Sequence, residues 1–385
     1  MLDYAIRNLG RSPTRLVLSV LGSALVVLLV IAATGFVRGM SASLDVSGSA
    51  DNVIILAAGS EESIERSEVE SSVPGVLEAA LPGIRTRSGV AYVAPQIHVM
   101  LPARTPSRSE PRQVMIRGVT PTSFLVHAGA RITDGRAPTS GADEIVVGRA
   151  AGVTLGVSNT ELEPGKSVEI DGRPWTIVGR FAAPGTVLEG EIWADLADLK
   201  SATRRDTVSC VIVTLEPDEA EFADADAFTK MRPDLELVAM TEADYYSALA
   251  GFFRPIRIVA WVTAGLIGLG GLFGGLNTMY AAFASRVREL GTLQSLGFRR
   301  SSIVFSLVLE ALLACSAGSL VAAAVGLFAL DGLAVRFSMG SFGLLVDGPV
   351  IGAGLFAGLL LGFFGSLPPA LRCLSLPIPV ALKSI

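Results

Sequence analysis

The sequence contains little histidine and little cysteine, and both shortages exclude classes of site. Its 385 residues include two histidines, His98 and His127, and three cysteines. Neither histidine has partner ligands at the spacing of a metal site, so we expect both to be surface or packed residues. Cys315 lies in an apolar run and Cys373 near the C-terminus, so only Cys210 lies in the polar middle of the chain. A disulfide within the polar middle of the chain is therefore excluded, and the cysteines do not report the redox compartment.

Complete motifs for nucleotide binding and for nucleophilic hydrolysis are also missing. Residues 164–167 end in Gly-Lys-Ser, but Thr160 stands where a phosphate-binding loop has its first glycine. Such a loop also leads into a helix, whereas a strand-like run follows here. No Gly-x-Ser-x-Gly stretch occurs. We therefore expect a protein that is not an enzyme, with no catalytic residues, no metal and no directly bound cofactor.

Charge is nearly absent from four long stretches of a chain that is 50% hydrophobic, with mean hydropathy +0.55. Residues 16–37 carry no charge, and as a helix they would be about 33 Å long, enough to cross a hydrocarbon core of about 30 Å. A cleaved signal peptide is the alternative, but its apolar part is shorter. Residues 256–284, 303–330 and 350–367 are the other predicted spans.

Basic residues indicate which connections lie inside the cell. They precede the first span, lie in the 285–302 connection and follow the last span. In these three places they are Arg7, Arg11 and Arg15; Arg286, Arg288, Arg299 and Arg300; and Arg372 and Lys383. Short loops rich in such residues stay cytoplasmic. We expect an inner (plasma) membrane protein with both termini, the 285–302 loop and the 368–385 tail inside. Residues 1–15 predict either an amphipathic surface helix or a simple basic flank. The 331–349 loop is expected outside.

Residues 38–255 form the second expected part, a large extracytoplasmic domain. Residues 39–254 carry a net charge of −12 and the rest of the chain +7, which argues against nucleic acid as a partner. Short strand-like runs alternate with turn signals and two helical stretches, typical of an α+β domain. Asp171-Gly172 predicts a tight hairpin turn, and residues of about 131–205 predict an inserted small β subdomain. Residues 104–112 predict a polar loop.

Two features within the spans are candidates for function. Gly270, Gly271, Gly274 and Gly275 form overlapping small-xxx-small pairs, which predict a helix-packing seam within the subunit or across a dimer. General glycine enrichment of membrane helices is the alternative. Glu310 is an intramembrane charge about two turns from the inner surface, where pairing with an arginine or snorkelling is expected. A role in gating or proton transfer is the alternative.

The 285–302 connection predicts a short helix with one apolar stripe, Val287, Leu290, Leu293 and Leu296, that ends at Gly297. Such a helix can dock into a groove of a soluble partner or lie against lipid headgroups.

This stretch resembles the MacB/FtsX-type family of ABC transporter permeases. Residues in register with the family's pattern are Asn277, Met279, Arg286, Glu289, Leu290, Gly291, Leu293, Leu296 and Gly297. Glu310-Ala311 resembles the start of the family's third span, and residues 5–9, 13–15 and 379–383 resemble its opening and closing segments. The order of one span, an outer domain and three spans also agrees. Gln294 departs from the basic residue usual there.

The resemblance implies a transport subunit that works with a separate ATPase, which would bind ATP and Mg²⁺. Two permease subunits, identical or paralogous, would pair with two ATPase copies. Whether a periplasmic adaptor also takes part is left open. The coupling helix would relay ATP-driven motion to the outer domain, for export or for extrusion of lipoproteins or amphiphiles. An FtsX-like relay that regulates a cell-wall hydrolase is the alternative. The implied ATPase-coupling residues are Arg286, Arg288, Glu289, Leu290, Gly291, Leu293, Leu296 and Gly297.

Overall fold

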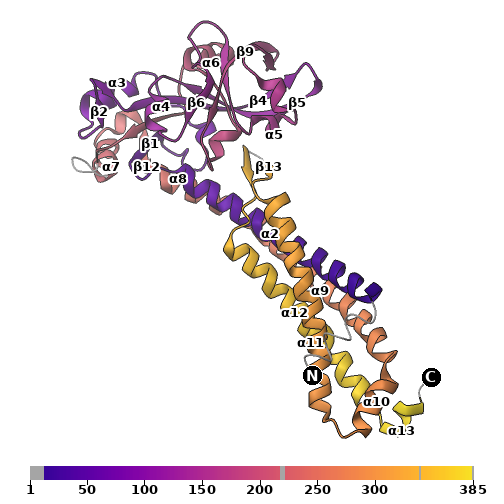
Figure 1. Cartoon of the computed structure of the whole chain (residues 1–385). Coiled ribbons are helices and arrows are strands. Elements are labelled where there is room, and N and C mark those ends of the chain that lie inside the picture. Colours follow the sequence, from indigo (N-terminus) through magenta and orange to yellow (C-terminus); the bar gives the residue numbers. More distant parts are fainter. Residues whose placement is uncertain (1–12, 217–221, 338–339, 384–385) are drawn as a thin grey trace. The chain divides into compact units, whose positions relative to one another are not determined.

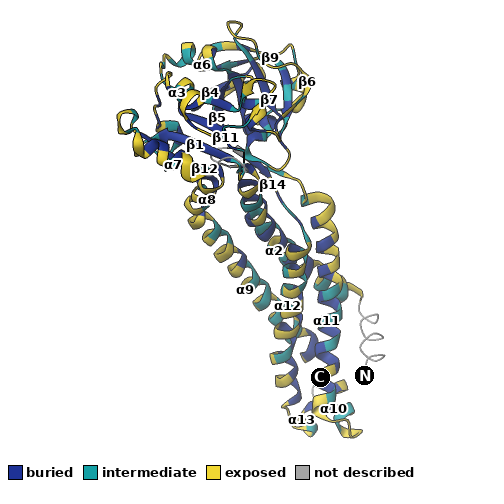
Figure 2. Ribbon diagram, turned by 90° about the vertical axis from the view of Figure 1, so that its left-hand side faces the viewer, coloured by how far each residue is buried: buried dark blue, intermediate teal, exposed yellow. Residues whose placement is uncertain are grey.

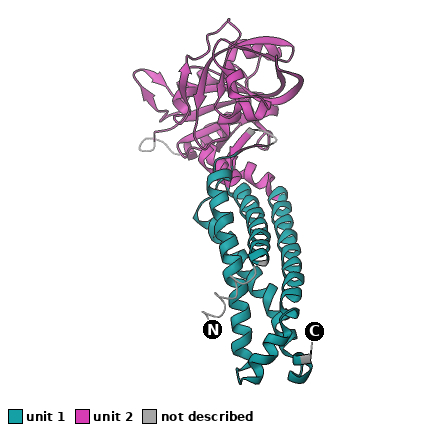
Figure 3. Cartoon of the chain, turned by 45° about the vertical axis from the view of Figure 1, so that its right-hand side comes forward, with its two compact units in different colours: residues 1–38, 255–333, 344–385 teal, residues 39–254, 334–343 magenta. Residues whose placement is uncertain are grey.

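The computed structural model describes residues 13–216, 222–337 and 340–383. Most of the amphipathic segment predicted in residues 1–15 therefore lies outside the described residues. The chain divides into two compact units (Figure 3). Unit 1 comprises Met1–Arg38, Pro255–Leu333 and Leu344–Ile385, and unit 2 comprises Gly39–Arg254 and Ala334–Gly343.

Long apolar helices make up unit 1 (Figure 1). They are α2 (Pro13–Ser47), α9 (Arg254–Ala284), α11 (Arg300–Val325) and α12 (Gly348–Leu374), with the short helices α10 (Val287–Ser295) and α13 (Ile378–Lys383). A π-helical turn, η5 (Gly326–Leu330), extends α11. Among the described residues, four helices are long and apolar enough to cross a membrane. Each is at least as long as the span predicted for it, because the helical hydrogen bonds continue past the residues where charge and proline begin.

Glycines set the close packing of α2, α11 and α12. A methyl group on Gly318 of α11 would overlap the Ser23 hydroxyl and lie 2.5 Å from the Val20 carbonyl oxygen of α2. A methyl group on Gly358 of α12 would overlap the Ser319 hydroxyl of α11. Small residues thus let these backbones approach, as is common between helices in lipid.

The glycine quartet on α9 is mostly open in this chain. A methyl group on Gly271 would lie 2.5 Å from Val26 of α2, whereas Gly270, Gly274 and Gly275 have no atom within 4 Å of such a group. Helix α9 is also the least buried of the four candidate spans (Figure 2). Among the described residues, the predicted seam is thus tightly packed at Gly271, and at Gly275 the chain is approached by α12, where a methyl group on Gly365 would lie 3.9 Å from the Gly275 carbonyl carbon.

We expect Gly318→Ala to destabilise unit 1 and Gly270→Ala to leave it unchanged. The first methyl group has no space beside α2, and overpacking of this kind costs about 1–3 kcal/mol, whereas the second meets nothing. Thermal unfolding of the purified chain in detergent, followed by size-exclusion chromatography, measures the difference. Equal melting temperatures for the two variants would contradict the helix contact described here.

A ten-stranded sheet forms the centre of unit 2, in the order β12-β1-β11-β4-β5-β10-β7-β9-β6, with β8 paired to β4 and β9. Its strands are β1 (Asn52–Ala57), β4 (Val93–Thr105), β5 (Arg108–Val119), β6 (Arg131–Gly135), β7 (Glu144–Gly148), β8 (Ser167–Ile170), β9 (Arg173–Ala182), β10 (Ile192–Asp195), β11 (Cys210–Thr214) and β12 (Leu237–Thr241). A separate two-stranded sheet pairs β2 (Thr86–Arg87) with β3 (Val90–Ala91).

Helices cover this sheet as α3 (Val73–Ala80), α4 (Ser123–Val126), α5 (Ala151–Leu155), α6 (Leu196–Thr203), α7 (Phe222–Met231) and α8 (Glu242–Phe252), with the 3₁₀ turns η1 (Ile64–Arg66), η2 (Asn159–Leu162), η3 (Val187–Gly190) and η4 (Pro233–Leu235). The main apolar core includes Ile55, Leu77, Ile97, Ile116 and Ile145, each essentially inaccessible to solvent. The unit is thus an α+β domain, and the five strands β6–β10 of the predicted β-rich insert continue the central sheet through β5.

Local turn chemistry and tertiary pairing shape the hairpins differently. Asp171 and Gly172 both have positive φ, 49° and 79°, and join β8 to β9 in the predicted two-residue turn. The polar segment 104–112, expected as a loop, instead extends the β4–β5 hairpin, where Ala103 pairs with Arg112. Pairing along a long neighbouring strand outweighs the weak strand propensity of its charged residues.

The 331–349 connection, expected as a loop, contains a second such hairpin. Strands β13 (Ala334–Phe337) and β14 (Gly340–Gly343) pair antiparallel and belong to unit 2. Ser341 and Phe342 on β14 are buried, and the Ser341 hydroxyl donates to the Ala150 carbonyl oxygen at 3.4 Å. Burial against unit 2 stabilises strand pairing that so short a segment would not maintain alone.

Candidate functional site

Helix α10 lies at one end of unit 1, between the ends of α9 and α11, and one of its faces packs against the chain itself. Val287 and Leu290 are buried in a cluster with Ala370 and Leu374 of α12 and Ala381 of α13. Each buried aliphatic side chain of this size contributes about 1.5–3 kcal/mol. Helix α10 is thus packed into this end of the helix bundle of unit 1.

Gly291 allows α13 to approach this inward face. A methyl group there would lie 3.0 Å from the Ala381 methyl carbon, tighter than ordinary van der Waals contact. Leu293 is partly buried against the same cluster. The apolar stripe, which the sequence predicted as a possible docking face for a partner, therefore packs largely inside unit 1.

Arg286 connects the start of α10 to α11. Its Nη1 donates to Glu310 Oε2 at 3.1 Å, and its Nε donates to Glu289 Oε2 at 3.3 Å. The side chains of Arg286 and Glu310 are 9% and 8% exposed, whereas that of Glu289 is 56% exposed. Removing one partner from so buried an ion pair is destabilising, because the charge of the other partner stays buried. The intramembrane charge thus pairs with an arginine.

Gly297 ends the helix in the conformation that its residue type favours. Its φ is +92°, and the Phe298 amide donates to the Leu293 carbonyl oxygen at 3.2 Å, the long bond of a Schellman cap. The chain turns sharply here towards α11, which begins at Arg300. The turn leaves the apolar side chains of Leu296 and Phe298, 70% and 47% exposed, at the bundle end.

The second face of α10 is polar and exposed. It carries Arg288, Glu289, Thr292 and Ser295, with Leu296 at the end of the helix. The predicted coupling residues therefore divide into two groups. Arg286, Leu290, Gly291 and Leu293 position the helix and Gly297 ends it, whereas Arg288, Glu289 and Leu296 are exposed.

A buried polar network in unit 2 was not anticipated from the sequence. Arg117 on β5 and Glu191 form a two-bond ion pair, Nε to Oε2 and Nη2 to Oε1, each 2.7 Å, with side chains 3% and 5% exposed. Arg117 Nη1 also contacts Gln96 Oε1 at 2.8 Å and His98 Nε2 at 2.9 Å. The Trp193 indole donates to Glu191 Oε2 at 2.7 Å. Both charges are thus compensated within the domain.

Burial sets the ionisation of the groups around this pair. It lowers the pKa of His127 to about 3 and that of His98 well below the ordinary value, with a further lowering from the positive charge of Arg117. Burial also raises the pKa of the Cys210 thiol to about 12 and raises the pKa of Glu242. Both histidines are therefore neutral near pH 7, and the Cys210 thiol is not a nucleophile.

A weak signal for this network was present in the sequence. Gln96 and His98 alternate with apolar residues on one strand, and Arg117 is the polar residue of a similar run on another strand. These three side chains can therefore share one face of the sheet. The partners Glu191 and Trp193 lie more than seventy residues away, and only the β5–β10 pairing brings them together.

The Gly-Lys-Ser segment has no phosphate-binding geometry. Gly165 has φ +92°, the Lys166 amine binds the Thr160 carbonyl oxygen, and strand β8 begins at Ser167. A phosphate-binding loop instead places its backbone amides at a helix N-terminus.

Comparison with solved structures finds similar outer domains at low sequence identity. The periplasmic region of MacB from Actinobacillus actinomycetemcomitans is 12% identical, with TM-score 0.41, over 53% of this chain and 94% of that one. The extracellular domain of the noncanonic ABC-type transporter YknZ from Gram-positive bacteria is 16% identical, with TM-score 0.38, over 49% and 100%. A domain of a permease protein from Porphyromonas gingivalis is 14% identical, with TM-score 0.35, over 49% and 88%.

Family-level comparison gives the decisive result. No curated protein matches the chain. The model of the MacB-like periplasmic core domain matches residues 16–231, more than half of the chain, and the model of the FtsX-like permease C-terminal region matches residues 261–378. Together with four apolar helices, these matches identify a membrane-embedded protein. The chain belongs to the MacB/FtsX-type family of ABC transporter permeases.

Proposed function

We propose that this permease couples ATP hydrolysis by a separate ATPase to a conformational change of unit 2, and thereby drives export or extrusion of a lipoprotein or other amphiphile. Two copies of the ATPase and a second permease subunit, identical or paralogous, would complete the assembly. ATP and Mg²⁺ would be bound by the ATPase.

The two-faced structure of α10 is the observation that carries this proposal. One face is tied to α11, α12 and α13 by the apolar cluster and by the Arg286–Glu310 pair. The other presents Arg288, Glu289, Leu296 and Phe298 to solvent. A helix anchored on one side and exposed on the other can transmit a push from a docked partner to the spans, whereas a mobile loop would absorb it.

The size of unit 2 supports export rather than a pure signalling role. Residues 39–254, in which strands β6–β10 extend the central sheet, form a domain larger than a signal relay needs.

We propose that both termini and α10 face the cytoplasm of the cell and that unit 2 faces outwards, because arginines gather in the 285–302 connection.

Cysteine labelling tests this orientation on a low background, since the three native cysteines are buried. We expect a membrane-impermeant maleimide to label Ser140→Cys in intact cells and Ser295→Cys only after permeabilisation. Both positions are exposed. Labelling of Ser295→Cys in intact cells would reverse the topology and remove the basis for ATPase coupling.

Copurification tests the docking surface. We expect an ATPase to copurify with the wild-type chain and Phe298→Asp to reduce its recovery by about tenfold, because truncation or charging of a docked aromatic anchor typically costs more than 1.4 kcal/mol. Leu125→Asp makes the same kind of change at an exposed position of unit 2, 38% exposed, and we expect full recovery. Absence of any ATPase from the wild-type preparation would contradict the proposal itself. Unchanged recovery with Phe298→Asp would contradict this docking surface.

A further inference from the structure

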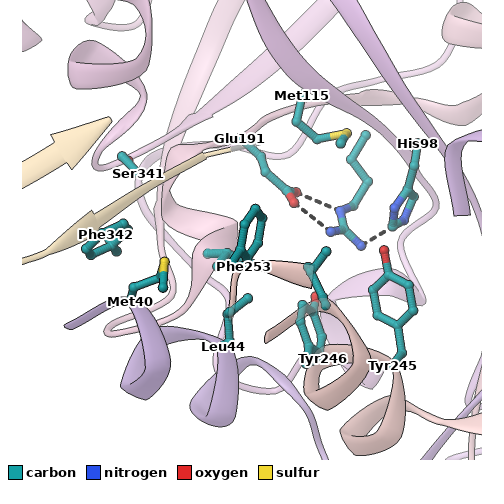
Figure 4. Close-up of a pocket in the computed structure, with 13 residues that line it drawn as sticks. Met40, Leu44, His98, Met115, Glu191, Tyr245, Tyr246, Phe253, Ser341 and Phe342 are labelled. Atoms are coloured by element: carbon teal, nitrogen blue, oxygen red, sulfur yellow. Dashed lines mark hydrogen bonds and ion pairs between the residues drawn. The ribbon is translucent and has the colours of Figure 1, made fainter. Parts of the chain in front are cut away.

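A pocket inside unit 2 is not explained by the coupling of α10 to an ATPase. It has about 60 Å³ of free volume, room for about four water molecules. Its apolar lining includes Met40, Leu44, Met115, Leu249 and Phe253, and its polar lining comes from His98, Ser341 and the Arg117–Glu191 pair. Figure 4 shows these side chains converging from several elements, with the ion pair along one wall.

Residues from each segment of unit 2 that leads into unit 1 line the pocket. Met40 and Leu44 lie on the last part of α2, Phe253 directly precedes α9, and Phe342 lies on the β13–β14 hairpin between α11 and α12. A ligand in this pocket would therefore touch the three parts of unit 2 that lead into unit 1: the end of α2, the residue before α9 and the β13–β14 hairpin. An ordinary packing defect in a domain core has no such relation to the topology.

The polar wall selects against a charged ligand. Glu191 compensates the charge of Arg117 in a two-bond pair, and burial keeps His98 neutral by lowering its pKa. A cation or anion entering here would find no uncompensated partner, and burial of an unpaired charge is strongly unfavourable.

The same wall retains capacity for a hydrogen bond from a ligand. A carboxylate offers about four acceptor positions, and three donors from the described residues reach Glu191: two from Arg117 and one from Trp193. The Tyr245 hydroxyl points towards the His98 side chain (Figure 4). A hydroxyl or amide N–H of a ligand can therefore be satisfied here while its hydrocarbon part lies among the methionine, leucine and phenylalanine side chains.

We infer that this pocket binds an uncharged group that carries one hydrogen-bond donor and a short alkyl chain, such as the end of a neutral amphiphile. Identification of this ligand as the transported substrate rests on the proposed function, whereas the binding itself does not.

The test uses the full chain in lipid nanodiscs without an ATPase, labelled with ¹³C at the methionine methyl groups. Met40 and Met115 line the pocket, and Met231, 72% exposed on α7, reports on unit 2 away from it. 1-Propanol, whose four heavy atoms match the volume of the pocket, is the probe, with propanoate and propylammonium as charged comparators. We expect 1-propanol to shift the Met40 and Met115 signals saturably without shifting Met231, and the charged comparators to bind about tenfold more weakly or less.

Two leucine variants separate pocket binding from partition into lipid. Leu249 is half-buried on the pocket wall and Leu125 lies on α4, outside it. We expect Leu249→Trp to fill the pocket and weaken propanol binding by about tenfold or more, and Leu125→Trp to change it by less than about twofold. Shifts of Met40 that persist in Leu249→Trp, that equal those of Met231, or that are as strong with propanoate would overturn the inference.

The same spectra distinguish the source of the natural ligand. If the Met40 signal before propanol is added changes when a neutral hydroxylated lipid such as a monoacylglycerol is included in the discs, the hydroxylated end of a lipid occupies the pocket; if it does not, the ligand comes from the aqueous phase. A negative result in the propanol assay leaves ATPase copurification untouched, and a failure to find an ATPase leaves propanol binding untouched.

Discussion

Arg117→Met is expected to destabilise unit 2 by about 3–5 kcal/mol, because it leaves the Glu191 carboxylate buried without its cation. The lost contacts are two 2.7 Å bonds to Glu191 and the bonds to Gln96 and His98. Denaturant unfolding followed by tryptophan fluorescence measures the change. Trp175 and Trp193 are buried in unit 2, and Trp261→Phe removes the signal from α9.

Two comparisons give this prediction its specificity. Arg104 and Glu169 also pair at 2.7 Å, but their side chains are 49% and 34% exposed, so Arg104→Met should cost no more than about 1 kcal/mol. The double variant Arg117→Met/Glu191→Gln should recover much of the loss, since no unpaired charge remains and the new amide oxygen can still accept the Trp193 bond. If Arg117→Met is as mild as Arg104→Met, the buried pair does not stabilise the domain.

Arg286→Met is expected to separate docking from transmission. It removes the bond between the start of α10 and the buried Glu310 side chain on α11. The exposed face of α10 is unchanged, so an ATPase should still copurify. Permease-dependent ATPase activity in nanodiscs should fall by about tenfold, because an anchor worth more than 1.4 kcal/mol is lost.

Conservative and outward substitutions provide the controls. Arg286→Lys keeps the charge and should retain most of the activity. Arg288→Met, on the exposed face of the same helix, should weaken copurification while the bound fraction stays active. Loss of copurification with Arg286→Met, rather than loss of activity alone, would mean that Arg286 contributes to folding or docking of α10 and not to transmission.

Features that depend on a few neighbouring residues followed from the sequence alone. Membrane spans follow from uncharged length, because lipid offers no partner for polar groups, and the described part of the chain contains four such helices. The Asp171-Gly172 turn and the Gly297 cap follow from backbone conformations that these residue types favour, and both are realised at positive φ. The family pattern around Arg286 and Glu289 also led to the correct class of protein.

Features that depend on which distant segments meet were decided only by the tertiary structure. Periodicity identified the apolar stripe of α10, but not that Leu290 and Gly291 face α12 and α13 of the same chain. The Arg117–Glu191 pair and the β13–β14 hairpin require contacts between residues far apart in sequence. Helical and strand periods specify which side chains share a face, whereas the partner of that face is chosen by the global packing of the chain, where burial free energy outweighs local preference.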